Sequence, residues 1–207
     1  MTRFLAPGSG FEILNYPTCD AVVEGSDESI QDITPEARKK AKEVISIIRV
    51  NRGKFISGCV DVEKYLGEVI GQFFFENESI KREMFHLFIL DTTLFSFSQK
   101  KKVLQRIMES NSDKFGPLTR KARQEMFDNI NYLIKIRNVF AHGEIVLDFQ
   151  KDHAFIRYFD SSINEKAEVI VSPDFFNELD TKISKVVMDL LPFIPEPKCS
   201  VMHFGDF

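Results

Sequence analysis

Apolar side chains at helical spacing dominate this sequence, and they constrain its fold more than any other feature. Between residues 55 and 73 they recur every three or four positions, at Phe55, Cys59, Val62, Leu66, Val69, Ile70 and Phe73. Such spacing places them on one face of a helix, and that face must be buried against other elements. Related patterns predict further helices at residues 34–53, 96–110, 118–142 and 173–194. A helical bundle is therefore expected.

Residues with strong preferences for helix ends divide these regions. Thr34 followed by Pro35 is typical of a helix start. Gly53 is typical of a helix end, so two separate helices are predicted on either side of it. Ser96 or Ser98 is expected to cap the helix that follows a short apolar segment.

The pattern changes after the fourth helix. Residues 144–149 and 154–159 alternate or run apolar around a polar turn, which predicts a β-hairpin, and residues 167–171 predict a third strand. A further helix follows. The predicted fold is mainly α: a helical bundle with a small antiparallel β insertion at about residues 144–171, between the last two long helices.

Composition fits one globular domain with short extensions. The 207 residues are 43% apolar and 28% charged, with 21 Phe and no Trp, so a Phe-packed core is expected. Residues 1–33 carry one basic and six acidic residues and are predicted to form an acidic N-terminal arm, with a short strand at residues 11–14. Residues 34–195 are assigned to the helical domain, and residues 196–207 to a C-terminal tail.

The expected location is the cytoplasm. No apolar run approaches membrane-spanning length, so no membrane partner is predicted. The three cysteines are far apart, which is typical of reduced thiols. Cys199 and His203 could form half of a zinc site, but no second pair of ligands has suitable spacing. Neither a metal nor a cofactor is predicted.

Basic residues are concentrated in one region, although the net charge is −4. Residues 98–123 carry two acids and eight bases, namely Lys100, Lys101, Lys102, Arg106, Lys114, Arg120, Lys121 and Arg123. One interpretation is a solvated helix face. The other is an electrostatic guide for RNA phosphates, for which the candidate residues are Lys100, Lys101, Lys102, Arg120, Lys121 and Arg123.

The end of the helix at residues 118–142 combines apolar and polar groups in an unusual way. With about 100° of rotation per residue, Arg137 falls in the middle of the apolar stripe, while Asn138 and His142 share the adjacent polar edge. Because burying an unpaired cation is costly, Arg137 is expected to have an acidic partner or to open onto a cleft. Glu63 is the predicted partner, since it lies close to the apolar stripe of its own helix. The other interpretation of Glu63 is a boundary residue that bends out to water.

The sequence IRNVFAHG at residues 136–143 resembles the R-x4–6-H signature of HEPN domains. The order of segments over roughly residues 40–145 is also similar to that superfamily, and SFSQK together with KIRNVFAHG is most similar to its mannitol-repressor-type branch. The resemblance implies a helical bundle that commonly forms homodimers, with two R-x4-H motifs facing each other. In active members it implies a metal-independent endoribonuclease, often a toxin or a defence effector.

The candidate catalytic residues are Arg137, Asn138 and His142. An imidazole can exchange a proton with the ribose 2′-OH or the leaving oxygen near pH 7, and a guanidinium can hold the phosphorane oxygens. The products would carry 2′,3′-cyclic phosphate ends. The expected partners are an RNA substrate, a second copy of the chain that contacts Ile136, Val139 and Phe140, and an antitoxin or regulatory protein.

The alternative function is a non-catalytic one. Many HEPN domains are not nucleases, and the mannitol-repressor-type branch is linked to transcriptional regulation. A regulator that acts by protein–protein binding through the same helices therefore remains open beside the ribonuclease.

Overall fold

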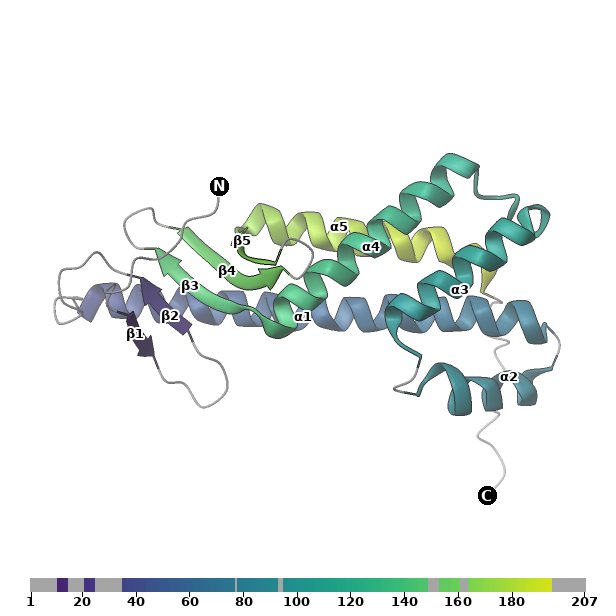
Figure 1. Ribbon diagram of the computed structural model, residues 1–207, viewed down its shortest axis with the longest axis horizontal. Coiled ribbons are helices and arrows are strands. Elements are labelled where there is room, and N and C mark those ends of the chain that lie inside the picture. The colour runs from purple at the N-terminus through teal and green to yellow at the C-terminus, as the bar shows by residue number, and fades with distance from the viewer. Residues whose placement is uncertain are drawn as a thin grey trace, which may run out of the picture. The chain divides into compact units, whose positions relative to one another are not determined.

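The fold is mainly helical, with antiparallel strands between α4 and α5, as predicted (Figure 1). The computed structural model describes residues 11–14, 21–24, 35–76, 78–92, 95–148, 153–160 and 164–194. The α-helices in this part of the chain are α1 (Pro35–Phe75), α2 (Ser79–Phe85), α3 (Phe97–Ser110), α4 (Arg120–His142) and α5 (Pro173–Leu190). Three short helical turns accompany them, η2 (His86–Leu90, a π-helical turn), η3 (Ser112–Phe115) and η4 (Leu191–Phe193).

The prediction of two separate helices on either side of Gly53 was wrong, because a single helix, α1, covers both. It runs without interruption from Pro35 to Phe75. The buried stripe continues across the glycine, with Ile48 on one side and Phe55 on the other. A glycine inside a helix costs only about 1 kcal/mol relative to alanine, which burial of a continuous apolar stripe outweighs.

Helix α3 begins at the serine that sequence analysis offered as one of two caps. Ser96 is the N-cap, and its hydroxyl accepts a hydrogen bond from the Gln99 backbone N–H at 3.4 Å. The Gln99 side chain in turn accepts from the Ser96 N–H at 2.7 Å. This reciprocal pair satisfies two backbone donors that would otherwise lack partners at the helix start.

The sheet has more strands than the predicted insertion. As predicted, β3 (Glu144–Asp148), β4 (His153–Asp160) and β5 (Glu165–Val171) pair antiparallel in that order. Strand β2 (Ala21–Glu24), which was not predicted, pairs parallel with β3. Strand β1 (Phe11–Leu14), which was predicted, pairs antiparallel with β2. Part of the N-terminal arm thus extends the sheet; the rest of residues 1–33 and the tail at residues 196–207 lie outside the described residues.

The chain divides into two compact units. Unit 1 comprises residues 1–60 and 132–183, and unit 2 comprises residues 61–131 and 184–207. Phenylalanine is prominent in both cores, as predicted: Phe55 and Phe140 are fully buried in unit 1, and Phe97 is in unit 2. Aliphatic side chains complete the core of unit 2, with Leu66, Leu104, Met126 and Ile130.

Two further findings concern membranes and thiols. Within the described residues, no helix combines the length and the apolar character needed to cross a membrane. Cys59 is buried and is not in a disulfide. The other two cysteines, at positions 19 and 199, lie outside the described residues.

Candidate functional site

The candidate site lies on the last turns of α4, in unit 1. Arg137 is half-buried, whereas Asn138 and His142 are exposed. Because Asn138 and His142 are four residues apart in one helix, their side chains emerge next to each other. The exposure of Asn138 and His142 agrees with the polar edge predicted for them, whereas Arg137, predicted in the middle of the apolar stripe, is only half-buried.

A glycine fixes the point at which α4 gives way to β3. The Gly143 N–H donates a hydrogen bond to the Val139 carbonyl at 2.7 Å, closing the last turn. A Cβ atom at position 143 would lie 2.3 Å from Ile156 Cγ2 and 2.5 Å from the Val139 carbonyl oxygen. Only glycine fits this close approach between the helix end and β4. His142 is therefore held at a tightly packed junction although its own side chain is exposed.

One basic residue at this junction was not predicted from the sequence. Arg52 of α1 donates from Nη2 to the carbonyl oxygen of Ala141, at 3.5 Å. The carbonyls at the C-terminal end of a helix carry partial negative charge, so a cation is stabilised there. No local signal could have revealed Arg52, because 89 positions separate it from Ala141. Its guanidinium is a second cation beside the turn that carries His142.

Glu63, the acid predicted to pair with Arg137, lies beside another cation. Glu63 belongs to unit 2, and there its Oε1 lies 3.5 Å from Nζ of Lys100. The same ammonium lies 3.7 Å from Oδ1 of Asp91. The ion pair between Arg137 and Glu63 stays a prediction.

Lys100 does not belong to the exposed basic residues that were predicted to bind RNA. Its relative exposure is only 4%, and it is held between two carboxylates. An ammonium buried between two carboxylates in this way is not part of an exposed basic face. Lys100, Lys101 and Lys102 are consecutive and were therefore predicted to act together. A helix, however, turns consecutive residues toward different sides.

The other predicted RNA-binding residues divide into two groups. Lys102, Arg120 and Lys121 are exposed. Lys101 and Arg123 are half-buried: Lys101 Nζ lies 5.7 Å from the centre of the Phe127 ring, and Arg123 donates to the Met108 carbonyl at 3.1 Å. All five belong to unit 2, and their role in binding RNA stays a prediction.

The three apolar residues predicted to contact a second copy are buried within a single chain. Ile136 and Val139 are each 3% exposed, and Phe140 is fully buried. The Phe140 ring packs edge-on against Phe55, with centroids 5.1 Å apart, and lies 6.0 Å from the ring of Phe176. The prediction that these residues offer a contact surface was wrong, because the same chain buries all three, and side chains of α1 and α5 cover Phe140.

One tyrosine in unit 1 has a shifted pKa, and the described residues hold no candidate metal site. Burial raises the pKa of the Tyr132 hydroxyl in unit 1, and the nearby carboxylate of Glu178 raises it further. The Lys182 ammonium lies over the same ring, 5.0 Å from its centre. Across the described residues, no cluster of three or more His, Cys, Asp or Glu side chains is placed to hold a metal ion.

No family model, curated protein or solved structure matches the chain. The site is therefore interpreted from the residues and contacts of this chain. The end of α4 carries the exposed imidazole of His142, the exposed amide of Asn138 and the guanidinium of Arg137. A second guanidinium, that of Arg52, contacts the Ala141 carbonyl near the end of the helix.

Proposed function

We propose that the protein is a metal-independent endoribonuclease of the HEPN type that acts at the C-terminal end of α4. The observation that supports this most is the pair of exposed side chains Asn138 and His142, on the same two turns as Arg137. An exposed imidazole beside permanent cations suits the transfer of protons around a phosphodiester. The R-x4-H signature adds the expectation of RNA cleavage.

In the proposed reaction the ribose 2′-oxygen attacks the adjacent phosphorus. His142 takes the proton of the 2′-OH while the new O2′–P bond forms. The P–O5′ bond breaks, and the departing 5′-oxygen receives a proton. The products are a 2′,3′-cyclic phosphate and a 5′-OH, with no net change in protons and no metal required.

The remaining residues would hold the phosphate. The Arg137 guanidinium would stabilise the equatorial oxygens of the phosphorane, where negative charge accumulates. Asn138 would hold a phosphate oxygen or fix the imidazole. Arg52, through its position beside the last carbonyls of α4, would add a second cation on the approach of the RNA backbone.

A second imidazole completes the reaction as proposed. One His142 supplies the base, and the His142 of a second copy would supply the acid that protonates the 5′-oxygen. Mixing wild-type protein with an excess of His142→Ala protein would then lower the activity of the wild-type chains. A lack of such inhibition, after time for exchange of subunits, would mean that each chain acts alone.

The decisive experiment incubates purified protein with a pool of labelled RNAs in the presence of EDTA. We expect 2′,3′-cyclic phosphate ends, and we expect His142→Ala to reduce their rate of formation by about 10²–10⁴-fold, as is typical when a general base is lost. Asn131→Ala, at an exposed position of the same helix, is the matched control and should keep full activity. Cleavage that persists in His142→Ala would reject this site.

The second candidate function is a non-catalytic regulator that binds another protein. It is favoured by large exposed apolar side chains in unit 2, among them Ile80, Leu87 and Phe88. In that case the RNA pool would remain intact with wild-type protein. Transcriptional regulation would then act through protein contacts.

A further inference from the structure

The sheet exposes one phenylalanine ring, that of Phe159 on β4. Among the phenylalanines of unit 1 whose side chains the structure describes, only Phe159 is exposed, at 61%. Phe140 and Phe155, by contrast, are buried. A single exposed apolar residue is ordinary on a protein surface, so the neighbours of the ring decide whether it has a role.

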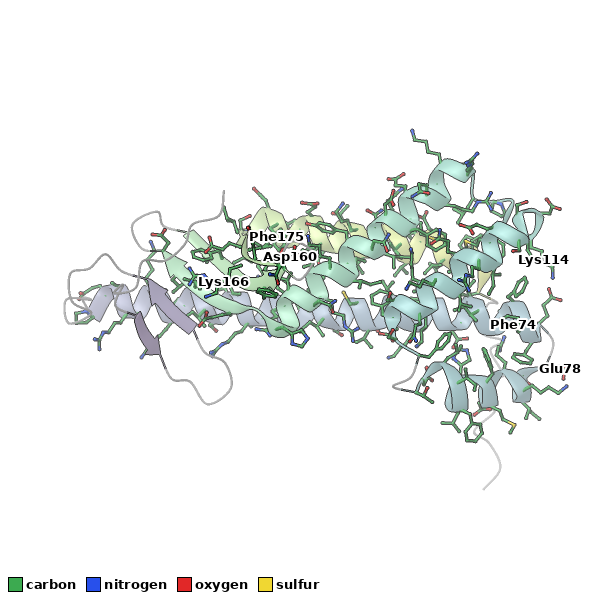
Figure 2. The ribbon with its side chains drawn as sticks, viewed as in Figure 1. Phe74, Glu78, Lys114, Asp160, Lys166 and Phe175 are labelled. Atoms are coloured by element: carbon green, nitrogen blue, oxygen red, sulfur yellow. The ribbon has the colours of Figure 1, made fainter. Side chains whose placement is uncertain are left out.

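The residue after Phe159 ties the end of β4 to α4. Nζ of Lys135, on α4, lies 3.4 Å from Oδ2 of Asp160, the last residue of β4 (Figure 2). Lys135, Asn138 and His142 follow one another at intervals of three and four residues, so they share one side of the helix. All three are exposed. The end of β4 therefore lies beside the side of α4 that carries two of the candidate catalytic residues.

The register of the sheet places Phe159 at the same end of the β3–β4 pair as His142. Glu144, two residues after His142, is paired with Arg157, two residues before Phe159. A Cβ atom on Gly143 would lie 3.2 Å from the Arg157 carbonyl oxygen, so the chain leaves α4 directly against β4. Two residues of a strand span about 7 Å. A nucleotide next to a phosphate bound at the end of α4 would thus extend toward Phe159.

The charged neighbours of Phe159 favour a nucleic acid as its ligand. Lys166 of β5 is exposed and is the direct cross-strand partner of Phe159, so both side chains extend from the same face of the sheet. Glu168, the next residue of β5 on this face, already pairs with Arg157 at 3.1 Å. In proteins that bind single strands, an exposed ring stacks on a base while a nearby cation holds the phosphate backbone.

The size of the exposed apolar surface also argues against a protein as the ligand at this position. One ring that is 61% exposed offers on the order of 100 Å², far below the area of a specific protein interface. A single base, which has a flat π-face, needs no larger surface.

We propose that Phe159 stacks on an unpaired base beside the phosphate held at the end of α4, so that the substrate is single-stranded RNA. This inference rests on the proposed ribonuclease function and names the class of its substrate. Bases inside a duplex are stacked on their neighbours and cannot offer a face to a side chain. Because every base has a π-face, cleavage should depend on the absence of pairing more than on base identity.

The test measures binding separately from cleavage. His142→Ala protein, which should cut RNA far more slowly, is the parent, and a labelled oligouridylate of about 12 nucleotides is the probe. Phe159→Ala and Phe159→Leu both remove the ring and should raise the dissociation constant roughly 5- to 150-fold. Phe159→Trp should bind as tightly as the parent. Since the chain has no Trp, this variant carries a single indole, whose fluorescence should be quenched when a base stacks on it.

Ile170→Ala is the matched control. It truncates another exposed side chain on the same face of the sheet, one that is 58% exposed and lies opposite Phe155 instead of Phe159. It should leave the dissociation constant unchanged, and pairing the probe with oligoadenylate should remove the effect of Phe159→Ala. Equal dissociation constants for the parent and Phe159→Ala, or full binding by Phe159→Leu, would overturn the proposal and leave the ring to a protein contact.

Cleavage separates this inference from the proposed function. With His142 present, Phe159→Ala should raise KM by the same factor and leave the unfolding temperature unchanged. His142-dependent cleavage that Phe159→Ala does not affect would overturn the stacking role alone. Ring-dependent binding without cleavage by the wild-type chain would reject the ribonuclease and keep the stacking role. A wild-type chain that neither binds the probe nor cleaves RNA would overturn both.

Discussion

The last turns of α4 and the segment α2–η2 are both rich in apolar side chains, but they use them in opposite ways. At the end of α4 a single chain buries Ile136, Val139 and Phe140, and the exposed groups are polar. On α2–η2 the outer apolar side chains are exposed. The proposed reaction uses the exposed polar groups of the first region. The second is suited to binding, because its exposed apolar surface gains free energy only when a partner covers it.

The largest expected difference between the two regions concerns stability. Phe140 is fully buried and Phe88 is 61% exposed, so the same substitution removes very different contacts. Phe140→Ala should lower the free energy of unfolding by about 3–5 kcal/mol. Phe88→Ala should change it by no more than about 0.5 kcal/mol at concentrations where the chain is monomeric. Chemical denaturation at low protein concentration measures both, and equal losses would show that Phe88 is buried in the isolated chain.

Glycine substitutions compare how tightly the two regions pack. Gly143→Ala brings a Cβ within 2.5 Å of a backbone oxygen, which cannot move aside without shifting the helix end, so a loss of about 1–3 kcal/mol is expected. In Gly71→Ala the nearest atoms belong to the side chains of His86 and Arg82, which can change rotamer, so we expect a smaller loss. Hydrogen exchange should locate that loss in α2–η2. Gly53→Ala, with nothing within 4 Å of its Cβ, is the control and should stabilise α1 by up to about 1 kcal/mol.

The sequence predicts exposure on a helix better than it predicts long-range packing, and the reason is physical. Helical spacing correctly placed Asn138 and His142 on an exposed side of α4, because position on a helix is a local property, whereas Arg137, predicted in the middle of the apolar stripe, is only half-buried. The same reasoning could not show which elements cover Ile136 and Phe140. The ring of Phe140, for example, packs against Phe55 and Phe176, which are far away in the sequence.

Contacts over long sequence separations explain the other differences. The pairing of β2 with β3 joins residues more than a hundred positions apart, and strand pairing of this kind leaves no periodic signal. Lys100 looked like one of three exposed lysines until the structure placed it beside Glu63 and Asp91. The sequence shows that the segment before Ser96 is short and apolar, but which of its side chains pack against α1 depends on residues distant in the sequence, such as Gly67 and Gly71.

The last comparison tests whether the polar end of α4 extends to α1. Arg52 touches the Ala141 carbonyl rather than any predicted catalytic residue, so its proposed role is to attract and hold the RNA backbone. Arg52→Ala should lower kcat/KM for RNA cleavage about tenfold, equivalent to about 1.4 kcal/mol. The loss should appear mainly in KM and should diminish at high salt, because salt screens the field of a cation that is in part open to solvent. Lys54→Ala removes an exposed cation two positions along the same helix and serves as the control. Equal effects of the two substitutions would show that Arg52 acts only as part of the general surface charge. A loss confined to kcat would instead indicate that Arg52 contacts the reacting phosphate.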